Sequence, residues 1–85
     1  MHENLASASD LVAEAGEAAD NDRLVDLAEQ LDSLARGERH ADHGRLARIQ
    51  SGLDEEQATV DDDVAVTIEE ALDAIDAHRE TLDGV

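Results

Sequence analysis

Residues 63–82 read DVAVTIEEALDAIDAHRETL, and this stretch decides the fold class. Its apolar side chains recur every three or four residues, which is the spacing of one face of an α-helix. The apolar face consists of Val64, Ile68, Ala71, Leu72, Ile75 and Leu82. The triplet Asp61-Asp62-Asp63 is expected to cap the N-terminus, where carboxylates suit the helix dipole, and Gly84 is expected to end the helix. The pattern therefore predicts a helix over about residues 63–82.

The same spacing continues through the rest of the chain, which contains no proline. It predicts three further helices, over about residues 3–19, 22–36 and 44–58. The polar run Asp20-Asn21-Asp22 offers side-chain oxygens to cap the second helix, and Gly37 suits a left-handed turn at its end. We expect an all-α protein: one helical domain over residues 1–85, with a hairpin over 3–36, a connection over 37–43 and a hairpin over 44–82, packed as an antiparallel four-helix bundle.

Two residues are unusual for their positions inside the predicted helices. Gly52 costs about 0.5–1 kcal/mol relative to alanine, so it indicates either a close approach of two helices or a bend. His78 lies beside the apolar face of the last helix and is expected to border the core. His2, by contrast, lies in a terminus that is expected to fray.

The two halves of the sequence resemble each other when one is shifted by 41 positions. Identical residues then coincide at several places, among them Leu5/Leu46, Ala6/Ala47, Asp20/Asp61, Glu29/Glu70 and Leu31/Leu72. One interpretation is a duplicated helical hairpin. The other is that any two acidic amphipathic hairpins align once their apolar faces are in phase.

Acidic residues dominate the composition. The chain has 23 Asp and Glu against 6 basic residues, all of them arginine, and its formal net charge is −17. Leu, Ile and Val make up only 19 of 85 residues, close to the level below which a highly charged chain is disordered. At about 1 M salt the Debye length is about 3 Å, so most of the repulsion is screened. The clear helical period and the even spread of charge disfavour a disordered acidic protein or an acidic tail, and we expect a halophilic protein.

The sequence also bears on location and on disulfides. It has no cysteine, which excludes disulfides and thiolate metal sites. The opening Met-His-Glu-Asn-Leu lacks the basic and apolar regions of a signal peptide. No apolar run approaches the roughly 18 residues that span a bilayer. We therefore expect a cytoplasmic protein without membrane contact.

Four of the six arginines fall between Arg36 and Arg48. Arg36 is explained by the C-terminal end of its helix, which favours cations. Arg45 and Arg48 lie in the first turns of the helix predicted over 44–58, where cations are disfavoured. One interpretation is that they pair with carboxylates of a neighbouring helix or subunit. The alternative is an anion site.

The anion site would combine Arg39, His43, Arg45 and Arg48 with the free N–H groups at the start of the helix. A phosphate-bearing ligand or an acidic partner segment would fit it. His40, Asp42 and His43 also include zinc-ligand types, but a fourth ligand is missing and arginines lie close by. Capping of the helix by Asp42 or His43 is the preferred interpretation, so we expect no metal and no other cofactor.

The stretch His43-Gly-Arg-Leu-Ala-Arg48, the aspartate-rich cap, the residues from Ile68 to Val85, and the opening Asn4 to Leu11 resemble a family of short proteins from halophilic archaea. That family is a domain of unknown function. The resemblance covers nearly the whole chain and implies an all-helical protein from a salt-rich organism. It implies no active site.

No catalytic motif or phosphate-binding glycine loop is present, so we expect a protein that is not an enzyme. Without aromatic residues, and with this net charge, binding of nucleic acid is not expected. The preferred function is protein–protein interaction, with an unidentified partner or as a homodimer joined through the alanine-rich first helix. The alternative is an anion- or nucleotide-binding regulatory protein that uses the Arg36–Arg48 segment.

Overall fold

The structure is a computed structural model that describes residues 2–82. Within this range the chain forms four helices and no strand, which confirms the all-α prediction. The helices are α1 (Glu3–Ala19), α2 (Asp22–Ala35), α3 (His43–Gln57) and α4 (Asp62–Glu80). Each begins and ends within two residues of its predicted bounds. Gly84, expected to end α4, lies outside the described residues.

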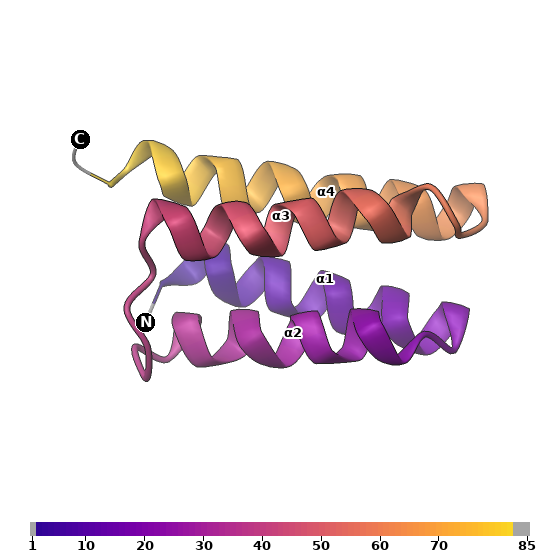
Figure 1. The fold of residues 1–85 in the computed structure, drawn as a ribbon, viewed down its shortest axis with the longest axis horizontal. Coiled ribbons are helices and arrows are strands. Elements are labelled where there is room, and N and C mark those ends of the chain that lie inside the picture. Colours follow the sequence, from indigo (N-terminus) through magenta and orange to yellow (C-terminus); the bar gives the residue numbers. More distant parts are fainter. Residues whose placement is uncertain (1, 83–85) are drawn as a thin grey trace.

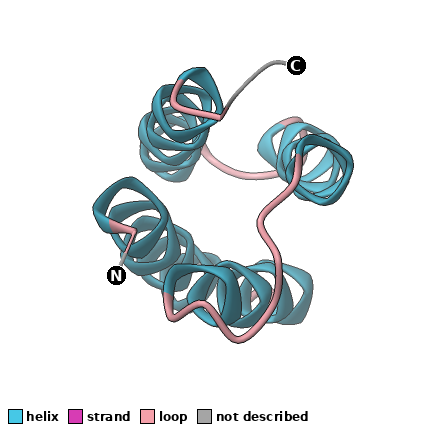
Figure 2. Cartoon of the chain, turned by 90° about the vertical axis from the view of Figure 1, so that its left-hand side faces the viewer, coloured by secondary structure: helices cyan, strands magenta, loops and turns pink. Residues whose placement is uncertain are grey.

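The four helices lie along the 35 Å long axis of a bundle whose other dimensions are 20 and 18 Å (Figure 1). Seen end-on in Figure 2, they occupy the corners of a square. Each helix packs on two neighbours: α1 and α3 both lie against α2 and α4, whereas the backbones of the helices on each diagonal stay more than 8 Å apart (Cα to Cα) within the described chain. The contacts of α1 are far more extensive than those of α3. Helix α1 is therefore the most extensively packed of the four helices, and α3 is the least.

The core is entirely aliphatic, and every helix contributes to it. Its largest fully buried side chains are Val12, Leu5, Leu24, Leu31, Leu34, Leu46, Ile49, Leu53, Ile68 and Ile75. The predicted apolar face of α4 is buried except at its two ends, where Val64 and Leu82 pack at the edge of the core. The alanines of α1 that point inward, Ala8 and Ala15, are also buried. The other alanines of α1 are half-buried (Ala6, Ala13, Ala19) or exposed (Ala18), so the predicted dimer interface on this helix stays a prediction.

The sequence-predicted caps are only partly made. Asn21 caps α2, since its Oδ1 atom accepts a hydrogen bond from the backbone N of Leu24 at 3.1 Å. Gly37 follows α2 with a φ of +78°, which confirms the left-handed turn. Asp61 occupies the N-cap position of α4, but its carboxylate accepts no capping hydrogen bond. The aspartates of this cluster therefore act on α4 through charge, with Asp62 and Asp63 in the first turn.

Two glycines allow helices to approach closely. A Cβ atom on Gly52 would lie 3.2 Å from Cδ1 of Leu27, so this glycine marks the close approach of α3 to α2. A Cβ atom on Gly16 would lie 3.0 Å from Cγ2 and 3.1 Å from the backbone N of Val25. Gly16 therefore allows the first turn of α2 to pack directly against the last turns of α1. The sequence analysis singled out Gly52 but not Gly16.

Candidate functional site

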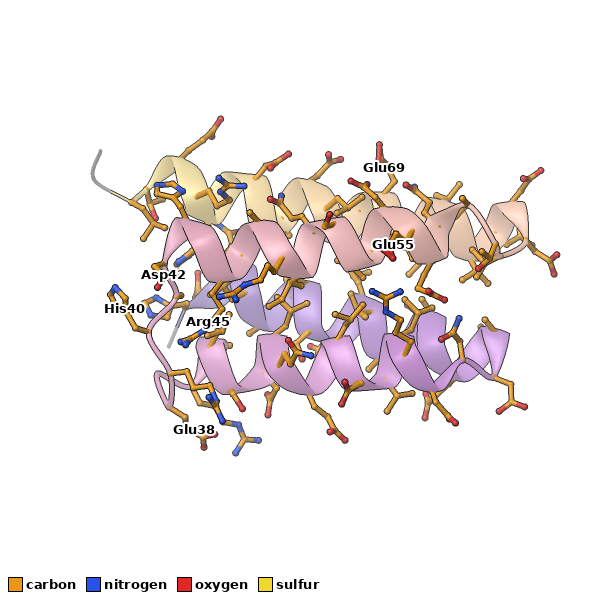
Figure 3. All side chains as sticks on the ribbon, viewed as in Figure 1. Glu38, His40, Asp42, Arg45, Glu55 and Glu69 are labelled. Carbon is orange, nitrogen blue, oxygen red and sulfur yellow. The ribbon has the colours of Figure 1, made fainter. Side chains whose placement is uncertain are left out.

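The segment from Arg36 to Arg48 forms the connection after α2 and the first turns of α3. Figure 3 shows His40 and Asp42 along this connection, at the end of the bundle where α3 begins. Most of the connection is exposed, but Ala41 is only 8% exposed and anchors it to the core. Because the connection is fixed in this way, the side chains around it have defined neighbours.

Asp42 caps α3, as the sequence favoured. Its Oδ1 atom accepts a hydrogen bond from the backbone N of Arg45 at 2.7 Å. This bond, followed by the positive charges of Arg45, His40 and Arg48, holds the pKa of Asp42 below its ordinary value. The positive end of the helix dipole therefore already faces a carboxylate of the chain itself. An external anion would have to bind elsewhere.

Arg45 is held at the start of α3 by the connection. Its Nη1 atom donates to the backbone O of His40 at 2.9 Å, and Figure 3 shows the side chain between α3 and α2. This carbonyl and the carboxylate of Asp42 offset the unfavourable position of a cation in the first turn. The predicted pairing with a carboxylate of a neighbouring helix is not found for Arg45 or Arg48 within residues 2–82.

Three of the four residues of the predicted anion site share one groove. This groove, called the Arg groove below, lies between α2 and α3 and has a volume of about 570 Å³. It is lined by Asp26, Glu29, Gln30, Ser33, Leu34, Arg39, Arg45, Arg48 and Ile49. Arg39 and Arg48 are exposed, and Arg45 is half-buried. The groove therefore combines three guanidinium groups with two carboxylates of α2.

His43, the fourth predicted residue, does not line the Arg groove. Its Nδ1 atom accepts a hydrogen bond from Nε of Arg79 at 3.1 Å, on the side of α3 that faces α4. Arg79 also donates from Nη1 to Oε1 of Gln50 at 2.6 Å, and Nε2 of Gln50 donates to Asp76 at 2.7 Å. These bonds tie the first half of α3 to the last turns of α4. The sequence spacing alone indicates that His43 and Arg45 lie on different sides of α3, because positions 43 and 45 are about 200° apart around a helix.

Ion pairs are scarce for a chain with so many carboxylates. Arg23 pairs with Glu55 at 3.0 Å and with Glu56 at 3.2 Å, which raises its pKa, and Arg36 pairs with Asp32 at 2.9 Å. In the part of the chain that the structure describes, no carboxylate lies within 4.0 Å of the guanidinium groups of the remaining arginines, which are Arg39, Arg45, Arg48 and Arg79. The three arginines of the Arg groove are thus available to a ligand.

A second, smaller groove of about 310 Å³ separates α3 from α4. It is lined by Gln50, Asp54, Glu69, Leu72, Asp73 and Asp76, so all of its charged residues are acidic. Among residues 2–82, no group of three histidine, aspartate or glutamate side chains is placed to hold a metal ion. His40, Asp42 and His43 in particular do not converge on one point.

The residues that α2 contributes to the Arg groove are not among those predicted from the sequence. The sequence signal that groups them is their helical spacing of three and four residues on the polar side of α2, at Asp26, Glu29 and Ser33. Their position opposite α3 depends on how the two helices are rotated about their axes. The contact between His2 and His78, whose ring centroids are 5.0 Å apart, is likewise not predicted from the sequence. The backbone N of His2 donates to the O of Ala35 at 3.2 Å, contrary to the prediction of a frayed end.

The fold and this site define a small all-helical bundle with a mixed-charge groove between α2 and α3. The chain belongs to the family of unknown function DUF7553, which matches residues 1–81. No curated protein and no solved structure matches the chain. None of the helices within residues 2–82 combines the length and the apolar character needed to cross a membrane.

Proposed function

We propose that this protein is a non-enzymatic interaction module that works in a salt-rich cytoplasm, and that it binds an acidic protein partner through the Arg groove. The observation that carries the proposal is the set of three arginines that line one groove and whose guanidinium groups have no carboxylate within 4.0 Å. In a chain of net charge −17, an exposed guanidinium group has many internal carboxylates to choose from. Guanidinium groups bind carboxylates through paired hydrogen bonds, so a free set favours an acidic partner.

The acidic surface and the aliphatic core both support the proposal that this protein is adapted to high salt, as expected for a haloarchaeal origin. The buried polar side chains of the described residues are limited to Ser9 and His78, and the rest of the core is aliphatic. The carboxylates lie outside this core, where concentrated salt screens their repulsion. We expect the helical content to rise between about 0.1 M and about 2 M KCl, and a chain equally folded at both would contradict this proposal.

We also propose that the bundle is antiparallel and that its two hairpins arose by duplication. Residues matched by the shift of 41 positions have matching burial: Leu5 and Leu46 are 0% exposed, as are Val12 and Leu53, while Leu34 and Ile75 are 1% and 0% exposed. An experimental structure tests this proposal directly. Hairpins that do not superimpose about a pseudo-twofold axis would exclude duplication.

The binding proposal is tested with an acidic peptide, such as an oligoaspartate of about ten residues, titrated into the protein at about 2 M KCl. We expect the wild type to bind it and the variant Arg39→Gln/Arg45→Gln/Arg48→Gln to bind at least about tenfold more weakly. Arg36→Gln is the matched control, since Arg36 lies in the same segment but pairs with Asp32. Equal binding by both variants, or no binding by the wild type, would contradict an acidic peptide partner at this groove.

A second function is favoured by the dimensions of the groove. A volume of about 570 Å³ falls in the range of small-molecule sites, and Leu34 and Ile49 give the lining an apolar part. An anion- or nucleotide-binding regulatory protein would use the same arginines. Inorganic phosphate or ATP should then raise the unfolding temperature of the wild type but not of Arg45→Ala. The absence of any increase would exclude this function.

A further inference from the structure

The Arg groove carries opposite charges on its two walls. Asp26 and Glu29 line it from α2, whereas Arg45 and Arg48 line it from α3. Within the described residues, no ion pair shorter than 4.0 Å joins the two walls. Each wall therefore presents charges that the other wall could neutralise but does not. A surface of this kind is complementary to itself.

A twofold axis can exploit this complementarity. If two copies face each other across their Arg grooves, with the axis parallel to the helices, α2 of each copy lies over α3 of the other. Rotation about such an axis leaves the height of each residue along the helices unchanged. Asn21 and Arg23 lie opposite Glu56, and Leu27 lies opposite Gly52, which sets the register of α2 against α3. In this register Glu29 and Arg48 lie at similar heights, with Asp26 and Arg45 to either side of that level, so the rotation brings Glu29 of each copy opposite Arg48 of the other. An axis perpendicular to the helices would instead place like charges together.

We propose that the occupant of the Arg groove is a second copy of this chain, with Glu29 of each copy paired to Arg48 of the other and with Asp26 and Arg45 adding to the charge complementarity on either side of this pair. This inference rests on the proposed function and names the partner. A stable interface covers about 800 Å² of each partner, roughly one sixth of the 4963 Å² that this chain exposes.

The dimer should respond to salt in an unusual way. Each copy carries a net charge of −17, so two copies repel each other at long range. The Debye length falls from about 10 Å at 0.1 M to about 3 Å at 1 M salt, which removes this repulsion while contact pairs at the groove are weakened less. Dimerisation should therefore be stronger at about 2 M KCl than at about 0.1 M KCl. Interfaces held by isolated surface ion pairs show the opposite trend.

Sedimentation equilibrium of the full chain at about 2 M KCl tests the proposal. We expect a dimer for the wild type, and a dissociation constant raised at least about tenfold both by Arg45→Glu/Arg48→Glu and by Asp26→Arg/Glu29→Arg. An equimolar mixture of the two variants should recover the dimer as a heterodimer. The matched control is Glu70→Arg/Asp73→Arg, an exposed pair at the same spacing on α4, which should dimerise as the wild type does.

Circular dichroism identifies any double variant that fails to fold, in which case Arg48→Glu and Glu29→Arg, at exposed positions, replace it. A dimer that persists in both groove variants uses another face and overturns the inference. A monomeric wild type also overturns it. The proposed function is then decided separately, because the oligoaspartate titration, run at protein concentrations at which the chain is monomeric, detects an acidic partner without competition from a second copy.

Discussion

The imidazole rings of His2 and His78 meet edge to face, with 5.0 Å between their centroids and 70° between their planes. His78 is only 6% exposed, and its Nε2 atom has no hydrogen-bond partner among the described residues. Burial, together with the neighbouring His2, lowers the pKa of His78. This contact joins the start of α1 to the last turns of α4, next to the end of α2.

The lowered pKa of His78 predicts that acid destabilises the fold. Below about pH 6.5 the histidine of the unfolded chain takes up a proton, while the folded chain resists it. The unfolded state then binds more protons, so the free energy of unfolding falls as the pH drops from about 6.5 towards the folded pKa. Denaturant unfolding at about 2 M KCl, followed from about pH 7.5 to 5.5, measures this loss. His78→Leu should flatten the profile and His40→Gln, at an exposed position, should not; an unchanged slope in His78→Leu would contradict the assignment.

Gly16→Ala should destabilise the protein by about 1–3 kcal/mol, because the new Cβ atom would meet both the side chain and the backbone of Val25. Gly44→Ala is the matched control. Its Cβ atom would approach only Asp42, at 3.6 Å, and alanine favours the helix, so stability should stay equal or rise by up to about 1 kcal/mol. Chemical denaturation at high salt compares the two. Equal effects at both positions would show that the close approach at Gly16 is absent.

Asn21→Ala should cost about 1 kcal/mol or more. It removes the capping bond to the N of Leu24 and the bond from Nδ2 to Oε1 of Glu56 at 2.7 Å. Asp61→Ala should cost only a few tenths of a kcal/mol, since the carboxylate of Asp61 makes no capping bond. The difference in unfolding midpoints of the two variants is the measurement. A larger loss for Asp61→Ala would reverse the assignment of the two caps.

Backbone amides of α3 should exchange with solvent faster than those of α1. Helix α3 has the less extensive contacts, and its first half is tied to α4 through Arg79. Hydrogen exchange measured helix by helix should show this order, and Arg79→Ala should speed exchange mainly in the first half of α3. Arg36→Ala is the control, because Arg36 pairs only within α2. Uniform exchange through α1 and α3 would exclude a weakly held α3.

The helices were predictable because their determinants are local. The apolar spacing that places Ile68 and Ile75 in the core repeats over consecutive turns of one helix. Asp42 lies only three residues before Arg45, whose backbone N–H it caps. The partners of the candidate site are not local. His43 and Arg79 are 36 residues apart, and sequence proximity grouped His43 with Arg45, whereas its imidazole accepts a hydrogen bond from Arg79. Which polar face of α2 meets α3 depends on helix rotation, and the apolar stripe constrains that rotation only coarsely.

The contact between His2 and His78 also has a topological consequence. It brings both ends of the described chain to the same end of the bundle, as Figure 1 shows. A short linker between them would close the chain into a ring, and a cut in the exposed connection after Gly37 would open it again. Such a circular permutant would read α3, α4, α1, α2 while keeping the same neighbours. The fold therefore does not require the first hairpin to be synthesised before the second.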